Sequence, residues 1–175
     1  MGLKENGLML LLFAYLLWRQ APSIINNFKA SAVVLQSQHY EIYSDPEKRS
    51  MIEFPAKNQR ALIIFWASWC GPCKIEMHRL EDSVKNKKIA AGRIFAINPF
   101  ESKDEIKAFL KKNALPFVFI DAPYIAQKLN VQSTPTTVFL ENKTVDSMSS
   151  GMSLVGIWRA EWFLRDETLR DGPTN

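Results

Sequence analysis

The sequence predicts an α/β protein in which helices cover both faces of a central mixed sheet. From Ala61 onwards, apolar runs of strand length alternate with segments whose apolar residues have helical spacing. A continuous apolar run such as residues 61–66 is typical of a strand buried on both faces, which requires helices on either side of the sheet. The last two predicted strands are close in sequence, so that edge is expected to be antiparallel.

A β-hairpin is expected before the first central strand. Short apolar runs at residues 33–35, 40–43 and 51–54 surround a turn signal at residues 44–46, a pattern that favours two paired strands. Ser102 is placed to cap the helix that follows it. The other predicted strands cover residues 61–66, 93–97, 117–120, 136–140 and 145–148, and the predicted helices cover residues 72–85, 103–112, 124–129 and 154–169.

Composition excludes several classes of protein. The 175 residues are 47% hydrophobic and 23% charged, which is the balance of a folded domain. The net charge is +4, but the basic residues are scattered and lack interleaved aromatics, so no nucleic-acid partner is expected. The two cysteines, Cys70 and Cys73, are too few for a disulfide-stapled scaffold. A zinc site would need both cysteines and both histidines of the chain, so no metal is expected.

The N-terminus carries a membrane signal. Residues 7–18 form an uninterrupted apolar run. Extended to residue 25, this segment is long enough to span a bilayer as a helix, and residues 1–25 are therefore predicted to be a signal-anchor. A cleaved signal peptide and a buried core helix remain as alternatives. Residues 26–32 are expected to be a tether, residues 33–170 the folded domain, and residues 171–175 a tail.

The chemistry is predicted to lie at Cys70 and Cys73, between a buried strand and a helix. The spacing of three places both sulfurs on one helical face, within reach of a disulfide. Cys70 would lie at the helix N-terminus, where free N–H groups and the helix dipole stabilise a thiolate. Pro72 suits a first helical turn, and Lys74 adds positive charge. Cys73, one turn along and less exposed, fits a resolving thiol.

The residues FWASWCGPCK at 65–74 resemble the active-site signature of the thioredoxin superfamily. Thr134 and Pro135, just before a predicted strand, resemble the cis-proline loop of that superfamily, although sequence does not give the isomer of the bond. The resemblance implies a thioredoxin-like fold in which Gly71, Pro72 and Lys74 complete the motif. It also implies that Trp69, Thr134 and Pro135 contact substrate.

Two residues favour one branch of the superfamily. Ile64 stands where cytosolic thioredoxins have a buried Asp, and Glu76 follows Cys73 by three residues. This arrangement resembles the membrane-tethered TlpA/ResA/CcmG (DsbE) group, which implies an N-terminal hairpin, a strand-helix insertion within residues 93–129, and a proton-transfer role for Glu76. The alternative for Glu76 is an exposed helix residue paired with Arg79 or Lys74.

The resulting functional hypothesis is a thiol-disulfide oxidoreductase that reduces protein disulfides through Cys70 and Cys73. The resemblance implies substrates such as the cysteines of apocytochrome c or of metal sites, and a membrane thiol-relay protein as electron donor. It also implies a single anchor in the bacterial inner membrane, or a cleaved signal, with the domain in the periplasm. No cofactor beyond the redox-active disulfide is expected, and the chain is expected to be a monomer. The alternatives are a dithiol oxidase or isomerase, a non-catalytic module that binds a client or Cu(I) through its thiols, and a cytosolic thioredoxin.

Overall fold

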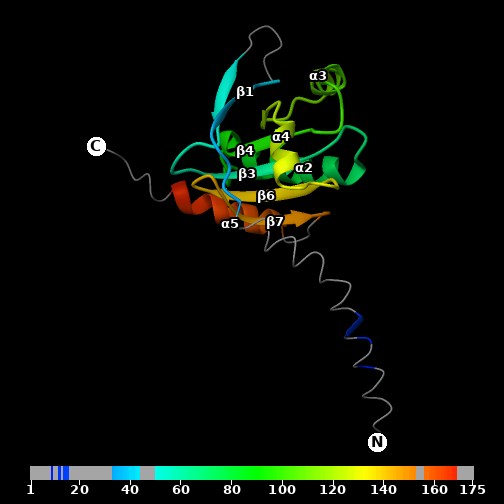
Figure 1. Ribbon diagram of the computed structural model, residues 1–175, viewed down its shortest axis with the longest axis vertical. Helices are drawn as coiled ribbons and strands as arrows, with labels where there is room; N and C mark the ends of the chain where they lie inside the picture. The colour runs from blue at the N-terminus through cyan, green and yellow to red at the C-terminus, as the bar shows by residue number, and fades with distance from the viewer. Residues whose placement is uncertain are drawn as a thin grey trace, which may run out of the picture.

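The computed structural model describes residues 33–43, 50–152 and 156–168, together with positions 9, 12, 14 and 15. A five-stranded mixed sheet in the order β5-β4-β3-β6-β7 forms the centre, and a separate two-stranded sheet pairs β1 with β2 (Figure 1). The strands are β1 (Gln38–Glu41), β2 (Met51–Phe54), β3 (Arg60–Phe65), β4 (Ile94–Ile97), β5 (Val118–Phe119), β6 (Thr136–Glu141) and β7 (Thr144–Ser150). The helices are α2 (Gly71–Lys85), α3 (Lys103–Lys112), α4 (Pro123–Lys128) and α5 (Gly156–Thr168), with a 3-10 turn at Ala91–Arg93.

The predicted α/β architecture and its element order are confirmed. Strand β3 lies at the centre, parallel to β4 and antiparallel to β6, and β6 and β7 form the antiparallel edge expected from their short connection. Residues 61–65 of β3 are completely or almost completely buried, as a continuous apolar run predicts. Ser102 caps α3 in a full capping box with Glu105.

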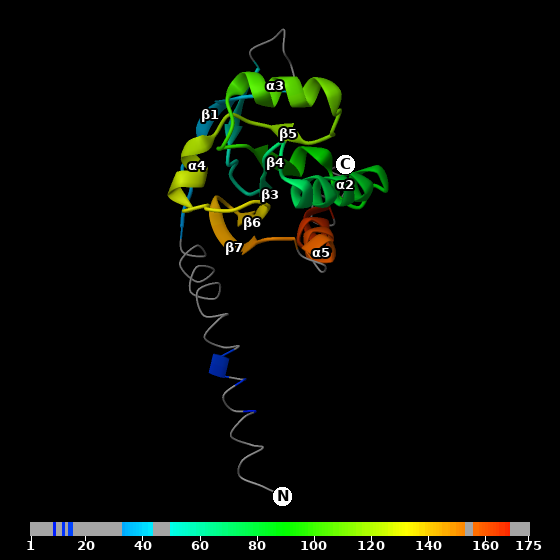
Figure 2. The same ribbon diagram turned by 90° about the vertical axis from the view of Figure 1, so that its right-hand side faces the viewer.

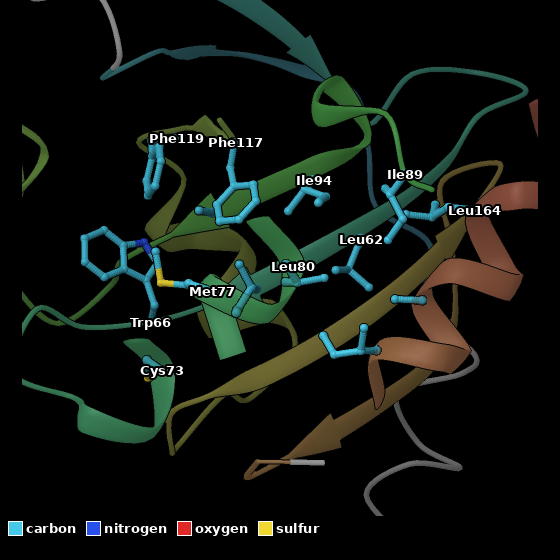
Figure 3. Packing of buried hydrophobic residues seen from close by; sticks show 14 of the residues in the cluster. Leu62, Trp66, Cys73, Met77, Leu80, Ile89, Ile94, Phe117, Phe119 and Leu164 are labelled. Carbon is cyan, nitrogen blue, oxygen red and sulfur yellow. The ribbon is translucent and has the colours of Figure 1, made fainter. Parts of the chain in front are cut away.

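Each face of the sheet has its own apolar core. The first core joins the sheet to α2, α3 and α5, through residues such as Leu80, Ile106 and Leu164. Figure 3 shows Leu80 of α2 and Leu164 of α5 on either side of Leu62 of β3. The second joins it to α4 and the hairpin, through residues such as Ile125 and Phe54. In Figure 2, α2 and α5 lie on one side of the sheet and α4 on the other, while α3 crosses the β5 edge.

The hairpin is confirmed for β1 and β2, but the assignment of residues 33–35 to it is wrong. Val33 and Leu35 instead bond to the far edge of the sheet: the Val33 carbonyl accepts from the Val145 amide at 3.0 Å, and the Leu35 amide donates to Lys143 at 2.8 Å. The chain therefore crosses from β7 to the hairpin. A partner more than a hundred residues away leaves no trace in local sequence pattern. The predicted turn at residues 44–46 lies outside the described residues.

The expected insertion is present between α2 and Pro135, where α3 and β5 extend the sheet beyond β4. Strand β5 covers only two residues of the strand predicted at residues 117–120, and it lies at the edge of the sheet. Its free side is covered by the chain after β1, since the Tyr43 amide donates to Phe119 and Ile42 bridges to Ile120.

The predicted anchor and tether fall almost wholly outside the described residues. Within the part of the chain that the structure describes, no helix has both the length and the apolar character needed to cross a bilayer.

Candidate active site

Cys70 and Cys73 are joined by a disulfide at the N-terminus of α2, with their Cα atoms 5.3 Å apart. Cys70 is the N-cap residue, and its Sγ accepts a hydrogen bond from the Cys73 amide at 3.2 Å. A sulfur at this position faces the unpaired N–H groups and the positive end of the helix dipole, which stabilise a thiolate after reduction. Cys73 is completely buried and Cys70 is 4% exposed. Both cysteines are therefore buried in the disulfide form, and Cys70 is the slightly more exposed of the two.

The residues between and after the cysteines face solvent. Gly71 and Pro72 are exposed, and no atom lies within 4 Å of the point where a Gly71 side chain would begin. Pro72 lies in the first turn of α2, where its missing N–H is not needed. The Lys74 ammonium lies 6.0 Å from the centre of the Phe109 ring on α3.

Thr134 and Pro135 lie at the same end of the sheet as the disulfide, and the bond between them is cis. Thr136, which follows, pairs with Phe65, the last residue of β3 before the cysteine loop. The Pro135 carbonyl accepts from the Gly151 amide at 2.7 Å, and Thr136 Oγ1 donates to Ser133 at 2.7 Å. These bonds fix the loop from both sides. A second cis bond, Phe54–Pro55, lies at the end of β2 and was not predicted.

Glu76 is 4% exposed, one turn after Cys73. Its Oε2 lies 3.5 Å from the Arg79 guanidinium and has no hydrogen-bond partner among the described residues. Burial raises the pKa of the Glu76 carboxyl, and Arg79 opposes part of that rise. The alternative of an exposed Glu76 is wrong, although the contact with Arg79 that it included is present.

A hydrogen-bonded network behind Cys70 was not predicted. The Glu101 carboxylate accepts from the Ser68 amide at 2.6 Å, from the Ser68 hydroxyl, and from Asn98 Nδ2 at 2.6 Å. It thereby ties the turn after β4 to the loop that holds Cys70. Burial would raise the pKa of Glu101, but the hydrogen bonds from Ser68 and Asn98 outweigh it and keep that pKa below its usual value. No sequence signal pairs residues 33 positions apart across two loops.

An aromatic pair lies in the two loops that this network joins, since the Phe100 amide donates to Asn98 Oδ1 at 3.1 Å and Trp69 follows Ser68. Trp69 is 67% exposed and Phe100 is 43% exposed, and their rings meet edge to face with centres 6.4 Å apart. Trp66, by contrast, is buried against Phe109 and Phe119 and belongs to the core. His78 is exposed and pairs with Glu81 at 3.1 Å. Within the described ranges, no group of three or more His, Cys, Asp or Glu side chains could hold a metal ion.

A dithiol at a helix N-terminus, next to a cis-proline loop on a mixed sheet, defines a class of redox-active proteins. Residues 47–153 match the family model described as a thioredoxin-like domain. Since this match covers more than half of the chain, the protein belongs to the thioredoxin-like family.

Curated relatives lie in the branch that the sequence resembles. The chain is 35% identical over 102 residues to the thioredoxin-like protein YneN of Bacillus subtilis, covering 57% of this chain and 59% of YneN. It is 30% identical over 101 residues to the thiol-disulfide oxidoreductase ResA of the same organism, covering 55% of this chain and 56% of ResA. The matches thus span less than two thirds of these relatives.

A solved structure agrees with the fold. The crystal structure of StoA from Bacillus subtilis superposes with a TM-score of 0.61 at 19% identity, over 75% of this chain and 98% of StoA. The family match and these relatives confirm the resemblance to the thioredoxin superfamily and to its ResA-like branch.

Proposed function

We propose that this chain is a protein thiol-disulfide oxidoreductase whose residues 33–170 form the catalytic domain. The observation that carries the proposal is the Cys70–Cys73 disulfide at the N-terminus of α2, at the same sheet end as the cis Thr134–Pro135 bond. The names of ResA and of the sporulation thiol-disulfide oxidoreductase A of Bacillus subtilis support the same activity.

In the reducing direction, the reaction begins with the reduced dithiol. The Cys70 thiolate attacks one sulfur of a substrate disulfide, forms a mixed disulfide with it, and expels the other substrate sulfur as a thiolate. The α2 N-terminus lowers the energy of the attacking thiolate. Trp69, Thr134 and Pro135 contact the substrate chain, because they lie at the same end of the molecule as Cys70.

The second step closes the protein disulfide. The Cys73 thiolate attacks Cys70 Sγ, which regenerates the Cys70–Cys73 bond and releases the second substrate thiolate. Two electrons pass from the protein to the substrate. Glu76 accepts the Cys73 proton, since a carboxyl buried one turn away with a raised pKa is suited to proton transfer near neutral pH.

The cellular setting is part of the proposal. The apolar run at residues 7–18 tethers the domain to the bacterial inner membrane, with the active site in the periplasm. A membrane thiol-relay protein then returns electrons to the disulfide. The substrates are cysteine pairs of apocytochrome c or of metal-binding proteins.

Trapping of substrate tests the roles of the two cysteines. The Cys73→Ser variant should accumulate mixed disulfides through Cys70, because the resolving thiol is missing. The Cys70→Ser variant should trap no substrate and should lack disulfide-reductase activity on insulin. Trapping through Cys73 in the Cys70→Ser variant would contradict the assignment.

The direction of electron flow is tested by the reduction potential of the Cys70–Cys73 pair, equilibrated against glutathione buffers. A value near that of thioredoxin, about −270 mV, would support a reductase. A value near that of DsbA, about −120 mV, would identify an oxidase. An active-site pair that binds Cu(I) stoichiometrically and does not reduce insulin would identify a non-catalytic binding module instead.

A further inference from the structure

Helix α5 exposes two tryptophans that the core does not use. Trp158 and Trp162 are 74% and 71% exposed, while Ile157, Ala160 and Phe163 on the opposite side of the helix are buried. Residues four apart lie next to one another on a helix, so the two indoles form one continuous patch. Neighbouring exposed large apolar side chains of this kind mark an interaction surface rather than a stable water-facing one.

The side chains beside the indoles are cationic. Arg159 and Arg165 are exposed on the same side of α5. Arg159 contacts Asp146 at 3.5 Å and lies 4.7 Å from the centre of the Phe139 ring, which orients it along β7. Among the described side chains of α5, at residues 156–165, the one carboxylate is Glu161. It is 7% exposed and bound by Ser83 and Lys88.

We propose that this face of α5, formed by Trp158, Arg159, Trp162 and Arg165, docks on the anionic headgroup region of a membrane. Indole rings prefer the interface between headgroups and acyl chains, where their apolar body and polar N–H are both accommodated. Arginines next to them are attracted to anionic lipids. Self-pairing of this face across a two-fold axis would bring the arginines of two copies together, which disfavours a second copy of the chain as the occupant.

The path of the chain brings a membrane to this face. Val33 bonds to Val145 of β7, and Arg159 of α5 bonds to Ser147 of the same strand. The point where the described domain begins and helix α5 therefore both lie next to the β7 edge of the sheet, at the opposite end of the domain from α3 (Figure 2). Residues 19–32 separate Val33 from the apolar run, a reach of at most about 50 Å when fully extended. In an anchored domain α5 is therefore within reach of the lipid surface, and the tether raises the effective concentration of lipid at this helix.

The consequence is a fixed orientation of the domain. With α5 on the headgroups, the disulfide at the N-terminus of α2 is held at a set height and direction relative to the membrane. Docking of α5 rests on the proposed function in one respect, because the anchor brings the helix within reach of the membrane. The experiment below measures docking of α5 and anchoring of the apolar run separately.

The test uses the full chain in phosphatidylcholine–phosphatidylglycerol vesicles whose acyl chains carry bromine, which quenches nearby tryptophans. Trp18→Phe removes the indole of the apolar run, and the triple variant Trp18→Phe, Trp158→Phe, Trp162→Phe reports Trp66 and Trp69 alone. We expect the Trp18→Phe protein to be strongly quenched and to emit at shorter wavelength, and the triple variant to lose most of that quenching. Arg165→Gln should lower the ratio of docked to undocked protein about fivefold. The matched variant Lys111→Gln on α3 should leave the ratio unchanged.

Each other outcome has a definite meaning. Quenching of Trp18, seen as the difference between wild type and Trp18→Phe, without quenching of Trp158 and Trp162 would overturn docking and leave anchoring in place. Quenching of Trp158 and Trp162 without quenching of Trp18 would support docking and contradict anchoring. No quenching of either would contradict both. A concentration-dependent emission shift without lipid, lost in the triple variant, would replace the lipid by a second copy of the chain.

Discussion

Glu76 is a titratable residue whose side chain is almost completely buried. It follows Cys73 by one turn on the buried side of α2 and contacts Arg79 at 3.5 Å, and burial raises the pKa of its carboxyl. The protonated form is therefore favoured in the folded protein more than in the unfolded chain. Ionisation of a carboxyl buried in this way is costly for stability.

Glu76→Gln is expected to separate these two effects. At a pH below the ordinary pKa of Glu, both states are protonated and stability should change little. As the pH rises through the raised pKa, the buried carboxyl of the wild type ionises and the free energy of unfolding of the wild type falls. The variant should therefore become more stable relative to the wild type. Thiol exchange should slow by about a hundredfold, because general acid–base assistance is lost.

The measurements are urea unfolding and insulin reduction, each across a range of pH. Glu81→Gln on the same helix is the control. Hydrogen bonds from Lys85 and His78 lower the pKa of Glu81, so its replacement should change stability with the opposite sign and should leave exchange unaffected. A Glu76→Gln variant with an unchanged pH–rate profile would show that Glu76 does not handle the proton.

Glu101→Gln is expected to loosen the loop that carries Cys70. The lowered pKa of Glu101 means that its carboxylate stabilises the fold above its ordinary pKa, and that this contribution is lost as the pH falls through the lowered value. At neutral pH the variant should lose about 1.5–3 kcal/mol, the range for hydrogen bonds to charged groups. Denaturant unfolding at neutral and acid pH measures this difference, which should shrink at low pH. A pH-independent difference would show that the charge is not what stabilises the loop.

At the scale of the element, α3 is stabilised at its start. Ser102 Oγ accepts from the Glu105 amide, and the Glu105 carboxylate accepts from the Ser102 amide at 2.9 Å. Asp104 and Glu105 in the first turn and Lys111 and Lys112 in the last turn complement the helix dipole. This helix covers the β5 edge and supplies Ile106 and Phe109 to the core next to Trp66.

Ser102→Ala is expected to lower the free energy of unfolding by about 1 kcal/mol, because the N-cap acceptor is lost. Glu105→Gln is the matched control, since a glutamine at this position preserves the capping box. Thermal unfolding of both variants measures the difference. A loss in Glu105→Gln as large as that in Ser102→Ala would mean that the negative charge of Glu105, and not only the capping box, stabilises the start of α3.

At the scale of the whole molecule, the sheet separates two apolar cores. Leu80 of α2 lies in one and Ile125 of α4 in the other, and both are almost completely buried. Because the two cores share no residue within the described part of the chain, substitutions across the sheet should act independently. In this fold, one set of strands contributes side chains to two separate apolar cores, one on each face of the sheet.

Leu80→Ala should cost about 2–5 kcal/mol and Ile125→Val about 0.5–1.5 kcal/mol. In the double variant the two costs should add to within about 0.5 kcal/mol. Leu80→Ala combined with Ile157→Val, whose residues share the first core, should deviate from additivity by more. Chemical denaturation of all variants measures this, and strong coupling across the sheet would contradict independent cores.

The sequence by itself determined the central strands, the helices and the position of the reactive pair. Continuous apolar runs, helical spacing and the Cys70–Cys73 motif are patterns within short segments. They predict strands, helices and the reactive pair without any knowledge of distant residues. The Ser102 cap was predicted for the same reason. The assignment of Cys70 to the helix N-terminus also needed only the residues on either side of it.

Only the tertiary structure decided which distant residues meet. Whether Glu76 is buried depends on how α2 packs on the sheet, and the contact of Glu101 with Ser68 depends on two loops that converge at one sheet end. Val33 pairs with β7 rather than with the hairpin, and α5 turns Trp158 and Trp162 to the outside. Long-range pairing and the choice of buried face result from packing of the entire chain, and spacing along a single segment does not contain that information.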